Sequence, residues 1–511
     1  MKIVQILFAA TLIFSGCSSP TESNQKTIRL AIIKDPPTID TRKSSDAFSS
    51  MMHFLLNSGL TRITKKNKVI NDLAESIDIS EDGLTYLFTL KNTYWSDGSL
   101  ITAKDFEENW KTVLSPEFPA PCVQMLYCIA NAKEAKEGHC SIDEIGVEAL
   151  DDKRLKVSLN TPTPFFLRLT AFPTYFPMKH SSDGKHLSSG PFVLDKWEHN
   201  SQLFLTANPK YHNRKNIDTE KLEFIVVENE GTAMKMFEQG EIDYVGGLLC
   251  PIPLDTMSQY VREKKAKFTP IPATARIYFN TATPPFNNLK IRKAISLAID
   301  RDEIIQAIAP FPARPATGLV PTIIKRTNAL PPVLEGDAKA LFEEGLKEEG
   351  FENIQEINMI YCSSEMNDKT VLVIQQQIRK ALGLTIHLEA VEFQNYLHRL
   401  KGGDYMMALG KWLAQFSDPI SILSCFKYAS EDRNFTNWEN SSFQKKLKKS
   451  AYVKNPLERM RILEKAEQII SNELPICPLF HWDDCYIHNS KANNVYFSGA
   501  GPPEWTEIED D

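Results

Sequence analysis

The chain has 511 residues, of which 42% are hydrophobic and 24% charged, a composition typical of a folded globular protein. Its formal net charge of −7 at pH 7 argues against a nucleic-acid-binding protein, which would carry a basic surface. At roughly 100–200 residues per domain, the length predicts two or three domains or lobes.

The chain begins with a segment that is typical of a bacterial export signal. Lys2 precedes an apolar stretch at residues 3–14, which is too short to cross a bilayer comfortably as a helix. Cys17 follows a Ser-Gly pair and resembles the lipobox cysteine that is acylated in bacterial lipoproteins, the alternative being a plain signal peptide with a chance cysteine. We therefore predict a lipoprotein signal peptide at 1–17 with lipidation at Cys17, and a flexible, polar tether at 18–26. The expected location is the periplasmic side of a bacterial membrane, with the protein lipid-anchored.

The other cysteines leave two alternatives open. An even number outside the cytoplasm permits one or two disulfides, but free buried thiols are equally compatible, because connectivity cannot be deduced from sequence. No paired C-x-x-C spacing supports a zinc site, so no metal is expected. The eight residues are Cys122, Cys128, Cys140, Cys250, Cys362, Cys425, Cys477 and Cys485.

Regular structure is first indicated at residues 27–33, a short apolar run of strand type that is followed by a proline pair. A helix is expected over 48–56, and a strand over 85–90 after an Asp-Gly turn. Thr102 begins a capping-box pattern and predicts the start of another helix. The proline-rich composition of 160–178 suits a crossover between two lobes.

The second half of the chain contains the clearest indication of the fold. A proline-dense stretch at 271–285 again suits a crossover, and an apolar stripe at helical spacing follows over 291–298. Residues 356–390 have the pattern of a strand at 357–360, a helix at 371–382 that is ended by Gly383, and a strand at 384–390. This order implies a βαβ unit and therefore an α/β lobe. The basic run 445–449 is expected on the solvated face of a helix.

Catalytic motifs are absent from the sequence or occur at chance level. There is no G-x-x-x-x-G-K-[ST], no H-E-x-x-H and no G-x-S-x-G. The S-x-x-K pattern of penicillin-binding serine acyltransferases occurs at 424–427, but also at 182–185 and 442–445, and lacks its companion motifs. We therefore expect a binding protein that is not an enzyme, with a cell-wall serine acyltransferase as the alternative of a different class.

Six motifs occur in a fixed order over most of the chain, each weak by itself and specific in combination. They are Leu73–Lys91 followed by Trp95–Phe106, Ser189–Trp197, Asn208–Tyr211, Gly240–Asp243, Ile291–Arg301 and Trp412–Pro419. Together they resemble family 5 of the extracellular solute-binding proteins, a group of oligopeptide, dipeptide and nickel binders.

The resemblance implies an α/β fold of the periplasmic binding protein type (class II, cluster C), with two lobes joined by a hinge plus an extra subdomain. We expect lobe I at 27–60, 172–275 and 480–511, the extra subdomain at 61–171, and lobe II at 276–479. A ligand would close between the lobes and be delivered to the permease subunits of an ABC transporter by a monomeric protein. No cofactor and no nucleic acid is expected.

The resemblance also implies which residues bind the ligand. In peptide-binding members an extended peptide pairs with the protein backbone as an added strand, and an aspartate captures its ammonium group. Neutral Gln415 stands in the place of that aspartate. Because a desolvated ammonium needs a counter-charge, either Asp418 or Asp46 supplies it, or the ligand lacks a free amine at this point. The implied ligand-binding residues are Ser44, Ser45, Asp46, Trp412, Leu413, Ala414, Gln415 and Asp418.

A second departure concerns the far end of the ligand. A cationic residue three positions before the tryptophan can meet a terminal carboxylate in the family, but Leu409 stands there, and Lys411 is the candidate substitute. Candidate ligands are ordinary oligopeptides, murein peptides, or a dipeptide, metal chelate or other solute. A chaperone or adhesin built on the same scaffold is a third class of function.

Overall fold

The computed structural model describes residues 26–43, 46–64, 67–324, 334–354, 356–493, 495–496 and 504–505. The predicted signal peptide with Cys17, most of the predicted tether, and Ser44 and Ser45 lie outside the described residues. Within the described part of the chain, no helix is long and apolar enough to cross a membrane.

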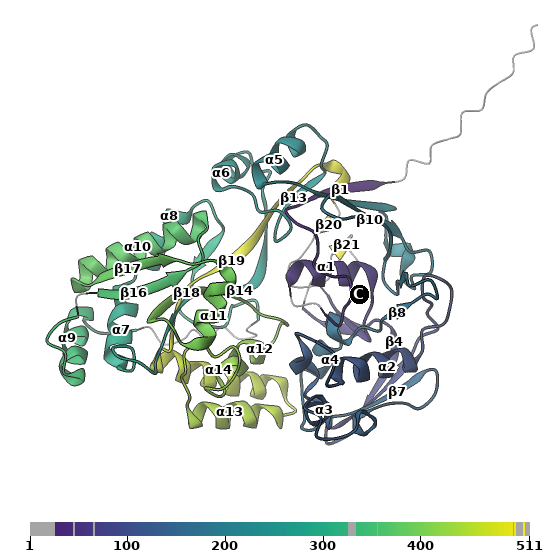
Figure 1. The fold of residues 1–511 in the computed structure, drawn as a ribbon, viewed down its shortest axis with the longest axis horizontal. Helices are drawn as coiled ribbons and strands as arrows, with labels where there is room; N and C mark the ends of the chain where they lie inside the picture. The colour runs from purple at the N-terminus through teal and green to yellow at the C-terminus, as the bar shows by residue number, and fades with distance from the viewer. Residues whose placement is uncertain are drawn as a thin grey trace, which may run out of the picture.

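One eleven-stranded sheet runs through the molecule and joins two lobes, as Figure 1 shows. Two long antiparallel strands, β14 (Lys267–Phe279) and β19 (Ile476–His488), lie side by side at its middle. The lobe I side has the order β10 (Phe192–Glu198), β11 (Gln202–Ala207), β12 (Lys221–Val226), β1 (Thr27–Ile32) and β13 (Tyr244–Gly246). The lobe II side has β18 (Met407–Leu413), β16 (Glu356–Tyr361) and β17 (Thr385–Ala390), and β15 (Ala313–Pro315) pairs with β19.

Lobe I is packed on both faces of its part of the sheet. Leu30 of β1 lies in an apolar cluster with α1 (Ala47–Leu56), and the next residue, Ala31, lies in a cluster with α5 (Glu230–Glu238) and α6 (Leu254–Arg262). Burial on both faces explains why the second half of β1, Leu30 to Ile32, is continuously apolar. The strand predicted at 27–33 and the helix predicted at 48–56 are therefore confirmed to within one residue at their ends.

Lobe II confirms the predicted βαβ unit, because β16 and β17 pair in parallel on either side of α10 (Glu365–Leu382) in the sequence. The helix starts six residues before the predicted position, where Ser364 caps Asn367, and ends at Gly383 with φ 70°. One face of the sheet packs on α7 (Leu289–Ala298), α8 (Arg301–Ile308), α9 (Ala338–Glu349) and α10. A second apolar cluster of lobe II includes residues of α11 (Phe393–Gly402), α12 (Ile420–Leu423), α13 (Ser441–Ala451) and α14 (Pro456–Glu473). In α13 the basic run 445–449 lies on the solvated side, as predicted.

The extra subdomain is a four-stranded antiparallel sheet with its own aromatic core. Its strands, in order, are β4 (Ala74–Ile79), β5 (Thr85–Leu90), β7 (Arg154–Ser158) and β6 (Val147–Ala149). The helices are α2 (Ala103–Leu114), α3 (Ala132–Lys136) and α4 (Phe166–Leu169), and Phe106 and Trp110 of α2 enter the core. Thr102 and Asp105 form the predicted capping box of α2.

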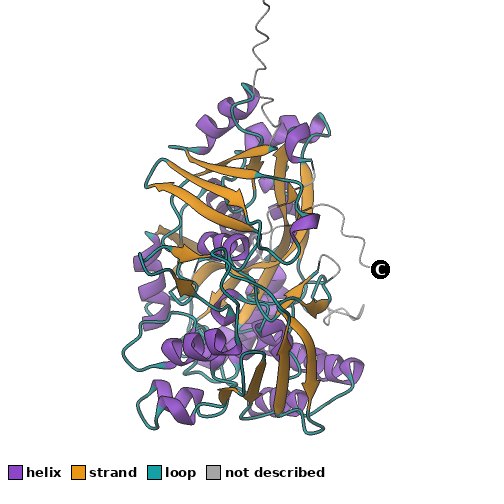
Figure 2. Cartoon of the chain, turned by 90° about the vertical axis from the view of Figure 1, so that its right-hand side faces the viewer, coloured by secondary structure: helices purple, strands orange, loops and turns teal. Residues whose placement is uncertain are grey.

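Short strand pairs complete the described chain, and helices flank the strands along the length of the molecule (Figure 2). The pairs are β2 (Thr61–Ile63) with β3 (Val69–Asn71), β8 (Lys179–His180) with β9 (His186–Leu187), and β20 (Val495–Tyr496) with β21 (Glu504–Trp505). All eight cysteines after Cys17 are free thiols, which corrects the alternative of one or two disulfides. Among the described residues no group of three potential ligands is placed to hold a metal ion.

Candidate functional site

The second predicted binding stretch begins on β18, at the end of lobe II that meets β14. β18 pairs with β14 over its whole length, from Met407 to Leu413, but with β16 only at Met407 and Ala408. Among the described strands, none pairs with the other edge of β18 from Leu409 to Leu413, although the Leu409 carbonyl accepts from the Tyr396 hydroxyl at 2.8 Å. This part of β18 is therefore a sheet edge to which an extended chain can add. Ala414, by contrast, donates its backbone N–H to Pro272 at 2.9 Å.

A guanidinium group is buried among aromatic rings on one face of this strand pair. Arg276 of β14 is 1% exposed, and its guanidinium carbon lies 4.9 Å from the ring centroid of Tyr278, 5.1 Å from that of Trp412 and 5.6 Å from that of Phe426. Cation–π contacts of this kind stabilise a desolvated cation. The side chains share a face because Thr274, two residues before Arg276 on β14, lies opposite Trp412 in the ladder.

Several donors of this cluster lack an acceptor. Nη2 of Arg276 donates to the Tyr278 hydroxyl at 3.0 Å. Nε and Nη1 of Arg276 and Nε1 of Trp412 are buried and have no hydrogen-bond partner among the described residues. Buried polar groups are normally paired, so these three N–H groups indicate a missing acceptor.

Gly410 makes room for this arrangement. It lies opposite Arg276 in the ladder, and a β-carbon at this position would be 2.2 Å from Cε2 of Tyr278. Only glycine therefore lets the Tyr278 ring cross β18 and form one wall around Arg276.

Gln415, at the position where the resemblance implies capture of an ammonium group, faces a cation instead. With its amide oriented to satisfy its neighbours, the Gln415 oxygen accepts from Nη1 and Nη2 of Arg433 at 2.9 and 3.1 Å. Arg433 also lies over the Trp412 ring, 5.3 Å from its centroid. We call Arg276, Trp412, Gln415 and Arg433 the cationic pocket.

Asp418, one of the two predicted counter-charges for an ammonium, is already ion-paired within lobe II. Its two oxygens accept from Nη2 and Nη1 of Arg459 at 2.9 and 2.7 Å, and both side chains are 7% exposed. The carboxylate is therefore already neutralised inside lobe II. Asp46, the other predicted counter-charge, caps α1 by accepting from the backbone N–H of Ser49 at 2.8 Å.

The extra subdomain faces this part of lobe II. Ser417 accepts a hydrogen bond from Nδ2 of Asn67 at 2.7 Å, and the rings of Phe165 and Phe416 stack with centroids 5.4 Å apart. Burial raises the pKa of the Cys122 thiol, and Arg433 opposes and Asp46 reinforces this rise. The charges of Asp46 in lobe I and Arg433 in lobe II therefore both act on Cys122 of the subdomain.

Lys411 lies on the opposite face of β18 from Trp412. Its side chain is exposed, and desolvation by the surrounding protein lowers its pKa to about 8. Leu409, in contrast, is buried at 3% exposure in the lobe II core.

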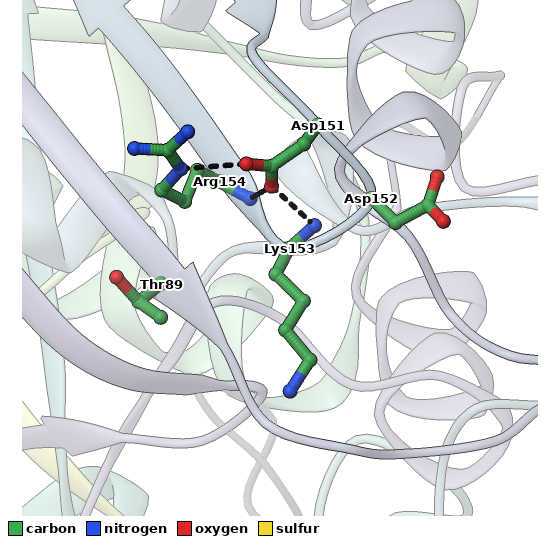
Figure 3. Close-up of a pocket in the computed structure, with 5 residues that line it drawn as sticks. All are labelled: Thr89, Asp151, Asp152, Lys153 and Arg154. Atoms are coloured by element: carbon green, nitrogen blue, oxygen red, sulfur yellow. Dashed lines mark hydrogen bonds and ion pairs between the residues drawn. The ribbon is translucent and has the colours of Figure 1, made fainter.

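A different hollow, drawn in Figure 3, lies on the subdomain and carries no comparable chemistry. It is lined by Thr89, Asp151, Asp152, Lys153 and Arg154. Asp151 already accepts from Nε of Arg154 at 2.7 Å and from two backbone N–H groups at 2.9 Å. Its carboxylate is thus occupied in shaping the turn before β7.

Sequence reasoning found Trp412 and Gln415 but missed Arg276 and Arg433. The signal for Arg276 was an arginine within an apolar strand, because the neighbouring residues from Ala273 to Phe279 are otherwise apolar or small. Arg433 follows two acidic residues in a loop and gives no local signal.

Comparison with known proteins gives the same family along nearly the whole chain. Residues 68–434 match "Bacterial extracellular solute-binding proteins, family 5 Middle". The sequence is 30% identical to the oligopeptide-binding protein OppA of Bacillus subtilis, over 98% of this chain and 97% of that protein. A substrate-binding domain of an oligopeptide ABC transporter from Bacillus anthracis has a TM-score of 0.76 at 26% identity, covering 95% of this chain and 99% of that one. The Escherichia coli murein tripeptide binding protein MppA shares the fold, with a TM-score of 0.78 at 21% identity and coverage of 94% and 99%.

Proposed function

Because the chain belongs to family 5 of the bacterial extracellular solute-binding proteins, we propose that it captures oligopeptides between its lobes and delivers them to the permease of an ABC importer. It is a transport binding protein that works outside the cytoplasm. The Bacillus subtilis relative, at 30% identity over nearly the full length, supports the peptide as ligand.

The observation that carries the proposal is the edge of β18 from Gly410 to Leu413, with which no described strand pairs. A peptide added to this edge would bind mainly through main-chain hydrogen bonds, which are independent of side-chain identity. Such binding suits a protein that must accept many different peptides. The added strand would lie beside the cationic pocket, since Trp412 belongs to both.

The two strands that connect the lobes, β14 and β19, contain a point at which the lobes can move relative to each other. The β14–β19 ladder is interrupted between Pro270 and Thr274, where Pro270 and Pro272 cannot donate backbone hydrogen bonds. Domain closure commonly occurs about a few residues of this kind, and a ligand that contacts both lobes favours the closed state. We place the hinge at this interruption, and Ser44, Ser45 and Asp46 are kept as proposed contacts from lobe I.

The membrane anchor is also part of the proposal. A lipid on Cys17 and a short tether would confine the binding protein near its permease and raise its effective concentration there. Support comes from the sequence around Cys17 alone.

The function is tested on protein that lacks residues 1–17. The protein is unfolded and refolded to remove co-purified ligand, and its stabilisation by added ligand is then measured. A ligand at 100 times its Kd should stabilise the fold by about 2.7 kcal/mol. We expect thermal shifts with pools of di- to pentapeptides, and murein tripeptide is a separate arm. The absence of a shift in every arm would reject the peptide as ligand.

A further inference from the structure

The cationic pocket holds two guanidinium groups and no matching acid. Arg433, half-buried, donates to the neutral Gln415, and Arg276 donates to a tyrosine hydroxyl. Among the described residues neither arginine forms an ion pair with a carboxylate. The two guanidinium groups of Arg276 and Arg433 therefore both contact the Trp412 ring, and neither has a counter-ion among the described residues.

Among the described residues no titratable group around the pocket pairs with either arginine: Asp46 acts on the same Cys122 thiol as Arg433, but its carboxylate caps α1. Asp418 is neutralised by Arg459. Burial raises the pKa of Cys425 to about 11 and also raises that of Cys122, so both thiols are uncharged at neutral pH. Burial raises the pKa of Glu431 too; the charge of Lys427 opposes this rise, that of Asp432 reinforces it and that of Lys133 opposes it.

Leaving a guanidinium buried and unpaired is costly, because its hydration is lost without a replacement. The aromatic rings offset part of this cost but offer no lone pair to Nε and Nη1 of Arg276. A carboxylate matches these donors in charge, and at the Nη1–Nη2 edge of a guanidinium its two oxygens accept side by side. The Trp412 indole N–H could add a further donor to the same group.

We propose that the cationic pocket binds a carboxylate of the ligand, so that the cleft selects acidic peptides. At this position the family resemblance implies an acidic residue that captures an ammonium. Here the neutral Gln415 accepts from Arg433, so the charge nearest to this position is positive. This inference rests on the proposed function and specifies its substrate class. The carboxylate is that of an acidic side chain, because a C-terminal carboxylate is common to all peptides and would give no such selection.

Isothermal titration of ligand-depleted protein separates a side-chain carboxylate from the C-terminal one. The probes are Glu-Ala-Ala, Ala-Glu-Ala and Ala-Ala-Glu with their glutamine counterparts, and Ala-Ala-Ala as free acid and as C-terminal amide. We expect at least a tenfold loss of affinity when glutamine replaces glutamate, because truncating one partner of a buried charge pair is costly. A loss with the amide alone would identify the terminus as the bound group and overturn the selection of acidic peptides.

Two variants connect the selectivity to the pocket. Arg433→Gln should abolish the preference for the acidic probe, whereas Arg154→Gln, at an exposed arginine of the subdomain, should leave it unchanged. Arg276→Met fills similar space without charge, so it should also abolish the preference while raising the melting temperature of the ligand-free protein. A purely structural Arg276 would instead lower that temperature, which would overturn the assignment.

The outcomes distinguish this inference from the proposed function. If peptides bind with equal affinity in acidic and neutral forms, the pocket assignment is wrong and the peptide-binding function stands. If no peptide binds at all, both are rejected. If wild-type selectivity persists in Arg433→Gln and Arg276→Met, the carboxylate binds elsewhere.

Discussion

At the residue scale, the site differs from the sequence-based expectation through two arginines that the chain brings together from distant positions. Gln415 was recognised as a departure from the family pattern because it lies within a motif. Arg276 and Arg433 are 157 positions apart, and only the pairing of β14 with β18 and the path of the following loop place both over Trp412. Sequence spacing alone contains no information on such a convergence.

Gln415→Asp tests the charge of the pocket directly. The new carboxylate would lie where the Gln415 oxygen now accepts from Arg433, and would pair with that guanidinium. We expect a higher melting temperature of the ligand-free protein and at least tenfold weaker binding of the preferred acidic peptide, measured by calorimetry. Gln415→Asn is the neutral control. Unchanged affinity in Gln415→Asp would place Gln415 outside the site.

Asp418→Asn separates a structural role from a ligand-binding role. The substitution leaves Arg459 buried with half of its ion pair, so we expect a loss of about 3 kcal/mol in the free energy of unfolding, measured by urea denaturation. Peptide affinity should stay within threefold in the folded variant. Weaker binding with unchanged stability would show instead that Asp418 contacts the ligand.

At the scale of elements, sequence patterns identified the units that form locally and missed the strands that join the lobes. The unit β16–α10–β17 follows from periodicity and Gly383, and the early start of α10 was missed because its first turns are polar. The stretch 271–285 was interpreted as a proline-dense crossover. Its first half belongs to β14, in which Pro270 and Pro272 are tolerated because the ladder to β19 is interrupted there.

A buried acid in β19 makes the stability of this junction depend on pH. Asp484 is 7% exposed, its Oδ2 has no hydrogen-bond partner among the described residues, and burial raises its pKa to about 7. The folded protein therefore holds a proton here that the unfolded chain has released above about pH 4. By linkage, this residue lowers stability progressively as the pH rises from about 4 to about 7.

Asp484→Asn should remove that dependence. We expect equal unfolding free energies of variant and wild type near pH 4, and a variant more stable by up to about 4 kcal/mol at pH 8. Burial lowers the pKa of His53 to about 3 and that of His186 to about 4, so these residues make the protein more stable as the pH rises. Both proteins contain them, so their contribution cancels when the stabilities of variant and wild type are subtracted. Denaturant titrations at several pH values measure it, and a constant difference would contradict an ionising Asp484.

At the scale of the whole molecule, the two-lobed architecture was predicted through the resemblance, whereas the domain boundaries remain predictions. The predicted limits at 275/276 and 479/480 fall inside β14 and β19, so the lobes share strands and have no linker between them there. The contacts of Asn67 with Ser417 and of Phe165 with Phe416 join the subdomain to lobe II beside the pocket. Long-range contacts of this kind depend on the tertiary fold and leave no local pattern in sequence.

Cys17→Ala tests the anchor of the full-length protein. If Cys17 is acylated, the variant should move from the membrane pellet to the soluble extracytoplasmic fraction after cell fractionation. Cys140→Ala, at a free thiol of the subdomain, is the matched control and should stay with the membrane. Membrane retention of Cys17→Ala would contradict lipidation at this residue.

The two lobes are connected by two strands, β14 and β19, so the loss of one connection does not separate them. β14 and β19 each carry the main chain from one lobe to the other, and they are hydrogen-bonded to each other on both sides of the interruption at Pro270. A single proteolytic nick in either strand therefore leaves the lobes connected by the remaining strand and its ladder. Cleaved protein should elute as one particle in gel filtration and separate into fragments only in denaturant, unlike a protein whose lobes hang on one flexible linker.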